Sequence, residues 1–275
     1  MLKLPGQEHR RIYRIGGVGF LNARPLLCGL DRHENVSLTL APPSGLLAGL
    51  ESGEYDAALI PSIDYQRCGC PLQVLPGMAI GSAGEVLTVR VFSRQPLGQI
   101  RRLACDTDSH TSVALVQILW RQRFGQELEL TDLPDSPTEH EAVLLIGDKV
   151  IPQLGRWEHE LDLGSTWQDL TGEPFIYAFW ALSERGQSPE LVRILQRAYK
   201  DGKQQLDSIA ADEGPQYGFE PALALKYLQH HLRFEFSQKQ MNGVSRFYQL
   251  AHEYELIPEW KKLSLYKLSV RPASV

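Results

Sequence analysis

Three stretches of the sequence place polar side chains where a small ligand binds in many α/β proteins. In the first, residues 12–26, apolar β-prone residues lead into the glycine-rich bend 16–19, which Asn22 and Pro25 follow. Glycine permits close backbone approaches, and proline suits the first turn of a helix. Asn22 is therefore predicted at the carboxyl end of a first strand, where open α/β sheets bind small molecules. The simpler alternative is a strand-to-helix turn with Asn22 as the helix cap.

The second stretch, residues 108–112, opens a predicted helix with a cluster of hydroxyl groups. Ser109, Thr111 and Ser112 would lie beside free backbone N–H groups and the positive end of the helix dipole, which together bind carboxylates or phosphates. The alternative is a plain helix cap made by Asp108 or Ser109.

The third stretch places Gly147 and Asp148 directly after the apolar run 142–146. Asp148 either meets a substrate or caps the next short helix. A glycine-bearing loop, residues 81–85, precedes Thr88 and is expected to line the same cleft, although a hairpin explains its glycines equally well.

Other catalytic motifs are missing from the sequence. There is no dinucleotide-binding glycine pattern, phosphate loop, nucleophile elbow or histidine-rich metal motif, so we expect no cofactor and no metal. Cys68-Gly69-Cys70 has no second cysteine pair and no nearby histidine, which disfavours zinc. These thiols are interpreted as reduced and incidental.

Composition indicates an ordinary soluble globular protein. The 275 residues are 43% hydrophobic and 22% charged, with a net charge of −5 and no massed basic residues, so we expect no nucleic-acid partner. No apolar run is long enough to span a bilayer, and the polar start of the chain does not resemble a signal peptide. A cytoplasmic location is expected, and the oligomeric state is not predicted.

The elements that must position these groups alternate between strand and helix. Strands are predicted at residues 12–15, 36–40, 56–61, 72–75, 78–80, 86–92, 102–105, 128–130, 142–146 and 174–182, with a further short apolar segment at 161–163; helices are predicted at 43–52, 111–123, 189–209, 221–230 and 238–253. Alternation of this kind favours a mostly parallel sheet. The runs 86–92 and 174–182 are expected to cross between two lobes, the first comprising residues 1–89 and 183–275 and the second residues 90–182.

Taken in order, several short motifs resemble those of the menaquinone-biosynthesis family of the futalosine pathway, in its chorismate dehydratase (MqnA) branch. They are Val18-Gly19-Phe20-Leu21-Asn22 with Pro25-Leu26, Gly53-Glu54-Tyr55-Asp56 with Ile60-Pro61, residues 81–88, Ser109-His110-Thr111-Ser112, Leu145-Ile146-Gly147-Asp148, Asp162-Leu163-Gly164 with Trp167, and Thr171-Gly172-Glu173-Pro174-Phe175.

This resemblance implies an α/β fold of two lobes, similar to type II periplasmic binding proteins, with two mixed sheets, a ligand cleft between the lobes and C-terminal helices. It also implies conversion of chorismate to 3-(1-carboxyvinyloxy)benzoate and water without a cofactor. The catalytic residues that it implies are Asn22, Thr88 and Asp148, and the substrate-binding residues are Ser82, Gly84, Val86, Ser109, Thr111, Ser112 and Gly147.

Two positions depart from the family pattern. Thr88 stands where serine is usual and Glu85 where proline is common, while His110 and Lys149 match no fixed position and receive no role. For proton removal we prefer the carboxylate on the enolpyruvyl arm of chorismate, with Asp148 as the alternative base. The alternative function is a non-catalytic binding protein for small carboxylates with the same fold.

Overall fold

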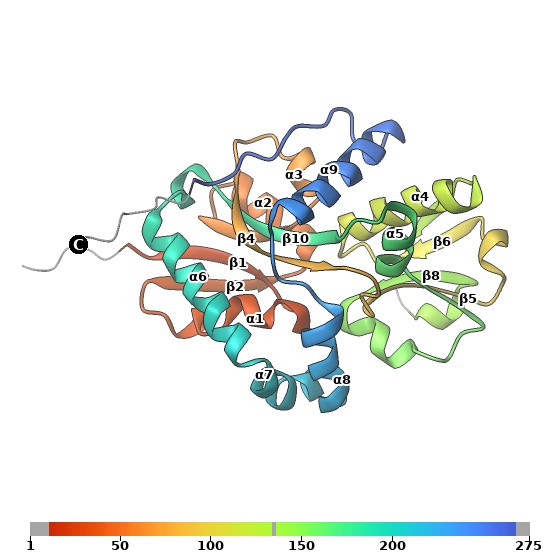
Figure 1. Ribbon diagram of the computed structural model, residues 1–275, viewed down its shortest axis with the longest axis horizontal. Coiled ribbons are helices and arrows are strands. Elements are labelled where there is room, and N and C mark those ends of the chain that lie inside the picture. Colours follow the sequence, from red (N-terminus) through yellow and green to blue (C-terminus); the bar gives the residue numbers. More distant parts are fainter. Residues whose placement is uncertain (1–10, 134–135, 268–275) are drawn as a thin grey trace, which may run out of the picture.

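The strands of the protein form two five-stranded sheets, one in each lobe (Figure 1). The computed structural model describes residues 11–133 and 136–267, so the polar start of the chain lies outside the described residues. The first sheet has the order β2-β1-β3-β10-β4 and the second β7-β6-β8-β5-β9. The strands are β1 (Tyr13–Val18), β2 (Val36–Ala41), β3 (Ala57–Pro61), β4 (Gln73–Ser82), β5 (Val89–Ser93), β6 (Arg102–Cys105), β7 (Glu129–Asp132), β8 (Ala142–Ile146), β9 (His159–Asp162) and β10 (Phe175–Leu182).

Both sheets are mixed, and their strand directions follow one pattern. In the first sheet β1 pairs in parallel with β2 and β3, and β10 runs antiparallel to both of its neighbours. In the second sheet β6 pairs in parallel with β7 and β8, and β5 runs antiparallel to both of its neighbours. The expected fold of two lobes with mixed sheets is confirmed. The mostly parallel sheet that the alternation of strands and helices favoured is not found, because two of the four strand pairings in each sheet are antiparallel.

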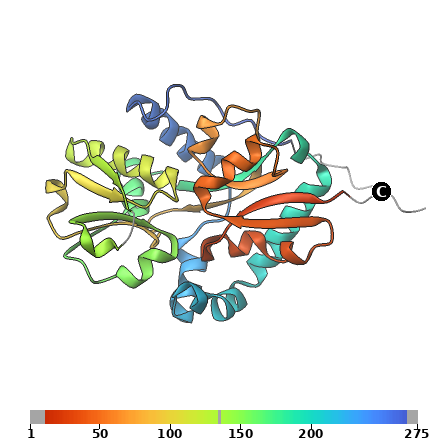
Figure 2. The same ribbon diagram turned by 180° about the vertical axis from the view of Figure 1, so that it is seen from behind.

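Helices cover the sheets on both faces, as Figure 1 and the reverse view in Figure 2 show. The helix α6 packs along α1 in the first lobe, while α9 lies over β10 and reaches α4 of the second lobe. The α-helices are α1 (Arg24–Leu27), α2 (Leu46–Glu51), α3 (Asp64–Arg67), α4 (His110–Phe124), α5 (Leu163–Thr171), α6 (Pro189–Gln204), α7 (Leu206–Asp212), α8 (Pro221–Lys226) and α9 (Gln238–Glu253), and the π-helical turn Tyr227–His231 continues α8.

Two predicted strand boundaries are wrong. The segments 72–75 and 78–80 belong to the single strand β4, which tolerates Pro76 and Gly77 because its pairing with β10 is irregular there. The run 86–92 is extended only from Val89, because Leu87 has a positive φ of 72° and its backbone N–H is held by the carboxylate of Asp162.

Some of the helices also differ from those expected. The predicted helix 189–209 is two helices, since Gln205 leaves helical angles with φ −109° and ψ 17°. The apolar segment 161–163 ends β9 and begins α5, a helix that the sequence did not reveal. Asp162 caps α5 by accepting a hydrogen bond from the Ser165 backbone N–H at 2.9 Å.

The strand β10 lies in the first sheet, between β3 and β4. The boundaries expected from the sequence assigned residues 175–182 to the second lobe. Hydrogen bonding with β3 and β4 decides otherwise, so the chain returns to the first lobe just before Phe175. The helix α9 packs closely at this return, where a Cβ on Gly243 would lie 2.1 Å from the carbonyl oxygen of Pro174.

Candidate active site

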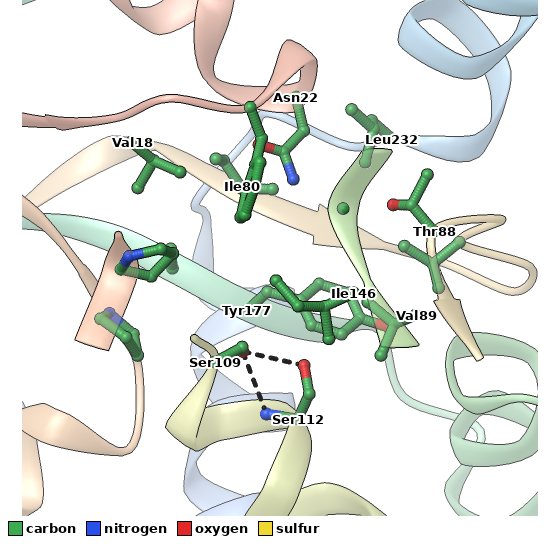
Figure 3. Close-up of a pocket in the computed structure, with 16 residues that line it drawn as sticks. Val18, Asn22, Ile80, Thr88, Val89, Ser109, Ser112, Ile146, Tyr177 and Leu232 are labelled. Carbon is green, nitrogen blue, oxygen red and sulfur yellow. Dashed lines mark hydrogen bonds between the residues drawn. The ribbon is translucent and has the colours of Figure 1, made fainter. Parts of the chain in front are cut away.

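A pocket lies between the lobes, where the carboxyl ends of β1, β3 and β8 converge (Figure 3). The empty space between its walls, including the part open to solvent, is about 510 Å³. Its lining is mostly apolar, with a few amide and hydroxyl groups: Val18, Phe20, Asn22, Pro43, Pro61, Ile80, Val86, Thr88, Val89, Ser109, Ser112, Ile146, Gly147, Tyr177, Ala178 and Leu232. None of these residues carries a charged side chain at neutral pH.

Asn22 lines this pocket from the short turn that follows β1. The backbone caps of the two short helices here are Phe20 and Ala23, and neither helix receives a hydrogen bond from a capping side chain. The Oδ1 atom of Asn22 is buried and has no hydrogen-bond partner among the described residues. A buried amide oxygen without a partner is costly, so this geometry favours a ligand-binding role for Asn22 over the capping alternative.

Thr88 lines the pocket beside a tyrosine that the sequence did not single out. The hydroxyl groups of Thr88 and Tyr227 lie 2.7 Å apart, and both residues are buried. Burial raises the pKa of Tyr227 well above its usual value; the Thr88 hydroxyl and the Asn22 side chain oppose this shift, and the Asp148 carboxylate adds to it. Tyr227 therefore remains a neutral hydroxyl at physiological pH and can orient Thr88.

The start of α4 supplies the hydroxyls on the opposite wall. The Ser109 Oγ lies 2.9 Å from the Ser112 Oγ and accepts a hydrogen bond from the Ser112 backbone N–H at 3.3 Å (Figure 3). Ser109 is thus the helix cap, as the alternative interpretation held, and it also lines the pocket together with Ser112. Thr111 points elsewhere: its Oγ1 accepts a hydrogen bond from the Ile63 backbone N–H at 3.2 Å.

Asp148 lies next to the pocket, one residue beyond Gly147 in the lining. Burial raises the pKa of the Asp148 carboxyl to about 7, while the Leu21 backbone N–H acts in the opposite direction. Its Oδ1 atom is buried and has no hydrogen-bond partner within the described chain. A carboxyl group with this pKa changes its charge near neutral pH.

Only one of the three predicted binding residues from the segment 82–86 lines the pocket. Val86 lines the pocket, whereas Ser82 and Gly84 lie behind Tyr177, against the first turn of α5. A Cβ on Gly164 would lie 2.5 Å from the Gly84 carbonyl oxygen and 2.7 Å from the Ser82 Oγ, so only glycine fits at this point of α5. Ser82 and Gly84 therefore support the wall of the pocket from behind.

Asp162 positions the segment that carries Val86 and Thr88. Its carboxylate accepts hydrogen bonds from the backbone N–H groups of Val86 at 3.0 Å and Leu87 at 2.9 Å, in addition to capping α5. An aspartate at the cap position before a helix could have pointed to Asp162. It was not recognised, because the helix α5 was not predicted. No feature of the sequence marked Tyr227 as a site residue, since a tyrosine in an amphipathic helix usually packs in a core.

Direct contacts join the lobes along one side of the pocket. The Nδ1 atom of His110 lies 2.9 Å from Oδ1 of Asp64, a buried side chain that follows β3. The backbone N–H of Ser44 donates to the carbonyl oxygen of Asp108 at 3.0 Å. Lys149 binds Asp106 and Asp108, with hydrogen bonds of 3.0 and 2.7 Å, and so joins the turns after β6 and β8.

Comparison with known proteins agrees with this arrangement. A family model described as menaquinone biosynthesis matches residues 13–253, which include every predicted site residue. The chain belongs to this menaquinone-biosynthesis family. A curated relative from Thermus thermophilus, named chorismate dehydratase, is 29% identical over 265 residues, covering 82% of this chain and 94% of the relative.

Solved structures with the same fold include binding proteins. A protein of Archaeoglobus fulgidus superposes with a TM-score of 0.71 at 14% identity, covering 91% of this chain and all of the other. The periplasmic aliphatic sulphonate binding protein SsuA from Escherichia coli superposes with a TM-score of 0.65 at 16% identity, covering 96% of this chain and 94% of the other. In the part of the chain that the structure describes, no helix is both long and apolar enough to cross a membrane.

Proposed function

We propose that this protein is a chorismate dehydratase, a carbon-oxygen lyase that converts chorismate to 3-(1-carboxyvinyloxy)benzoate and water. The observation that carries this proposal is the pocket between the lobes, which is apolar and holds only neutral hydrogen-bonding side chains. Support also comes from the family and from the name of the Thermus thermophilus relative. A cytoplasmic location is part of the proposal, since all four cysteines are free.

The reaction removes a proton from the ring carbon that bears the enolpyruvyl ether and expels the hydroxyl group from the neighbouring carbon. The electron pair of the broken C–H bond forms a ring double bond, and the departing hydroxide takes up a proton and leaves as water. Aromatisation of the ring supplies the driving force. The protein's task is therefore to orient the substrate and to assist the leaving group with hydrogen bonds.

Different side chains around the pocket bind the substrate carboxylate and the ring hydroxyl. Ser109, Ser112 and the N-terminal backbone of α4 bind one substrate carboxylate, because the helix dipole and hydroxyl donors favour an anion there. Asn22 and Thr88 hold the ring hydroxyl, with Tyr227 orienting Thr88 through their 2.7 Å hydrogen bond.

The base in this proposal is the substrate itself. No lining residue of the pocket has a side chain that accepts a proton readily at neutral pH, and Tyr177, the one titratable group among them, has its pKa raised by burial. The carboxylate on the enolpyruvyl arm can reach the ring proton when the arm folds over the ring. That proton then leaves with the hydroxide, so no net proton is taken from the protein.

Incubation of purified protein with chorismate tests the activity. We expect an aromatic ultraviolet spectrum and a product mass lower than that of chorismate by one water. Chorismate that binds, as measured by calorimetry, but is recovered unchanged would instead identify a non-catalytic binding protein.

A second comparison tests the base. The Asp148→Asn variant is assayed with chorismate, and the wild type is assayed with an analogue whose side-arm carboxylate is an amide. We expect the variant to turn over chorismate and the amide analogue to be inert. Loss of turnover by about 10²- to 10⁴-fold in a folded, substrate-binding Asp148→Asn variant, together with a reactive amide, would make Asp148 the base.

A further inference from the structure

We propose that Glu51, Cys68 and Cys70 form a binding site for a thiophilic divalent metal ion such as Zn²⁺. One potential ligand atom from each of these three side chains lies within 4.8 Å of the other two. Glu51 ends α2, whereas both cysteines lie in the turn between α3 and β4. The sequence did not reveal this cluster, because Glu51 lies far from the two cysteines in the chain.

The local backbone already holds the two sulfur atoms together. The Sγ atoms of Cys68 and Cys70 lie 3.1 Å apart, and the Cys70 backbone N–H donates to the Cys68 Sγ at 3.3 Å. Glu51 is tied to the same turn, since its Oε1 accepts a hydrogen bond from the Gly69 backbone N–H at 2.9 Å. The three side chains are therefore brought together before any ion binds.

The geometry is close to that of a tetrahedral thiolate site. Two sulfur atoms bound to one zinc ion at about 2.3 Å lie about 3.8 Å apart, so the thiols need to separate only slightly. Two thiolates and one carboxylate supply three ligands and leave a fourth position for water. Sulfur ligands select thiophilic ions such as Zn²⁺ or Cd²⁺ over Mg²⁺ or Ca²⁺.

Charge balance around the cluster also suits a bound dication. The Lys261 ammonium donates to the Cys68 carbonyl oxygen at 2.9 Å and lies over the Tyr65 ring, so it offsets part of the negative charge of two thiolates and Glu51. Cysteine binds a metal ion as the thiolate, so metal binding releases protons from the two thiols and affinity should increase with pH.

The bound ion would cross-link two segments of the first lobe. It would join the end of α2 to the turn between α3 and β4, and none of its three ligands lines the pocket between the lobes. An ion that binds only the folded chain stabilises it, so metal should raise the thermal midpoint rather than the turnover rate. This site is independent of the proposed dehydratase activity.

Titration of the fully reduced protein with Cd²⁺ tests the site. We expect one equivalent to bind, with a thiolate-to-cadmium charge-transfer band in the ultraviolet, and excess Zn²⁺ to weaken the band by competing for the site. The Cys70→Ser variant should lose the band, and Glu51→Gln should raise the Kd about tenfold or more because one ligand is lost. The matched controls are Cys28→Ser and Glu54→Gln, which change the same residue types outside the cluster and should bind as the wild type does.

Thermal unfolding supplies a second readout. Zn²⁺ in large excess over the Kd should raise the Tm of the wild type by several degrees and leave the Tm of Cys70→Ser unchanged. The proposal is overturned if Cd²⁺ gives no band, or if the band persists in Cys70→Ser. Equal Kd values for Glu51→Gln and the wild type would also overturn it.

Discussion

The two lobes have the same strand order and direction but different chemistry at the ends of the equivalent strands β1 and β6. In each sheet the second strand in the order, β1 or β6, pairs in parallel with two neighbours, and the fourth strand, β10 or β5, runs antiparallel to both of its neighbours. After β1 the chain makes a short turn and presents the Asn22 side chain, whereas after β6 it presents the start of the 15-residue helix α4. In the proposed function, the substrate would therefore contact side chains of the first lobe and mainly a helix N-terminus of the second.

A second contrast concerns the carboxyl groups that follow β3 and β8. Asp64 is paired with His110 at 2.9 Å and with Arg67 at 3.6 Å. Asp148 is buried without an ionic partner among the described residues, and its pKa is raised accordingly. Equivalent positions in similar sheets thus hold a paired carboxylate in one lobe and an unpaired one in the other, because only the first faces a cationic side chain.

The largest effect is expected from Asn22 in the first lobe. Asn22→Ala should lower kcat/KM by the equivalent of about 1–3 kcal/mol in transition-state binding. This is the usual cost of losing one partner of a buried hydrogen bond. Asn35→Ala changes an asparagine of the same lobe outside the pocket and should retain wild-type kinetics. If Asn22→Ala and Thr88→Val both keep the wild-type kcat/KM, the first lobe does not bind through these side chains.

Asp148→Asn should change the pH dependence of stability. With a pKa of about 7 in the folded protein against 3.8 ordinarily, the Asp148 carboxyl contributes stability below about pH 4 that is lost as pH rises through about 7. The stability of the amide variant does not change over this pH range, so its Tm at pH 8 should exceed that of the wild type by several degrees. Thermal unfolding at pH 5 and pH 8 measures the effect.

Asp64→Asn provides the opposite case. It removes a carboxylate that pairs with Arg67 and lies 2.9 Å from the His110 Nδ1 atom, so it should lower the Tm at neutral pH. The contrast between the two carboxyl groups fails if both variants shift the Tm in the same direction at pH 8.

A smaller effect is expected at the start of α4. Ser112→Ala should raise KM by the equivalent of about 0.5–1.5 kcal/mol, because it removes one hydroxyl donor and retains the backbone N–H that Ser109 caps. Ser109→Ala should raise KM similarly and also lower the Tm, because the cap is lost. Ser165→Ala, at the start of α5, is the matched control. An unchanged KM in both α4 variants would leave Ser109 with a capping role only.

The smallest effect concerns closure of the two lobes over the substrate, which we expect because the pocket lies between them. His110→Ala removes a contact between the lobes and should favour an open form by about 0.5–1.5 kcal/mol. Small-angle scattering with and without a bound product analogue should show a larger compaction for the variant than for the wild type. Superposable curves in all four conditions would contradict closure around the substrate.

Local patterns in the sequence determined most of the elements. The strands β6 and β8 and the helix α9 begin and end at the predicted residues, because apolar periodicity and turn residues act over a few neighbouring positions. The polar groups Asn22, Ser109 and Ser112 were also identified, since each follows a strand or opens a helix, as was Thr88, which comes after a glycine-bearing loop. All four line one pocket.

Tertiary packing decided what no local pattern records. The position of β10 in the first sheet, the support that Tyr227 gives to Thr88 and the placement of Thr111 against Ile63 all depend on residues far apart in the chain. The raised pKa of Asp148 likewise follows from its burial, which residue type and spacing do not specify. Local sequence therefore determined which groups stand at the ends of strands, and long-range packing determined which of them meet and in what state of charge.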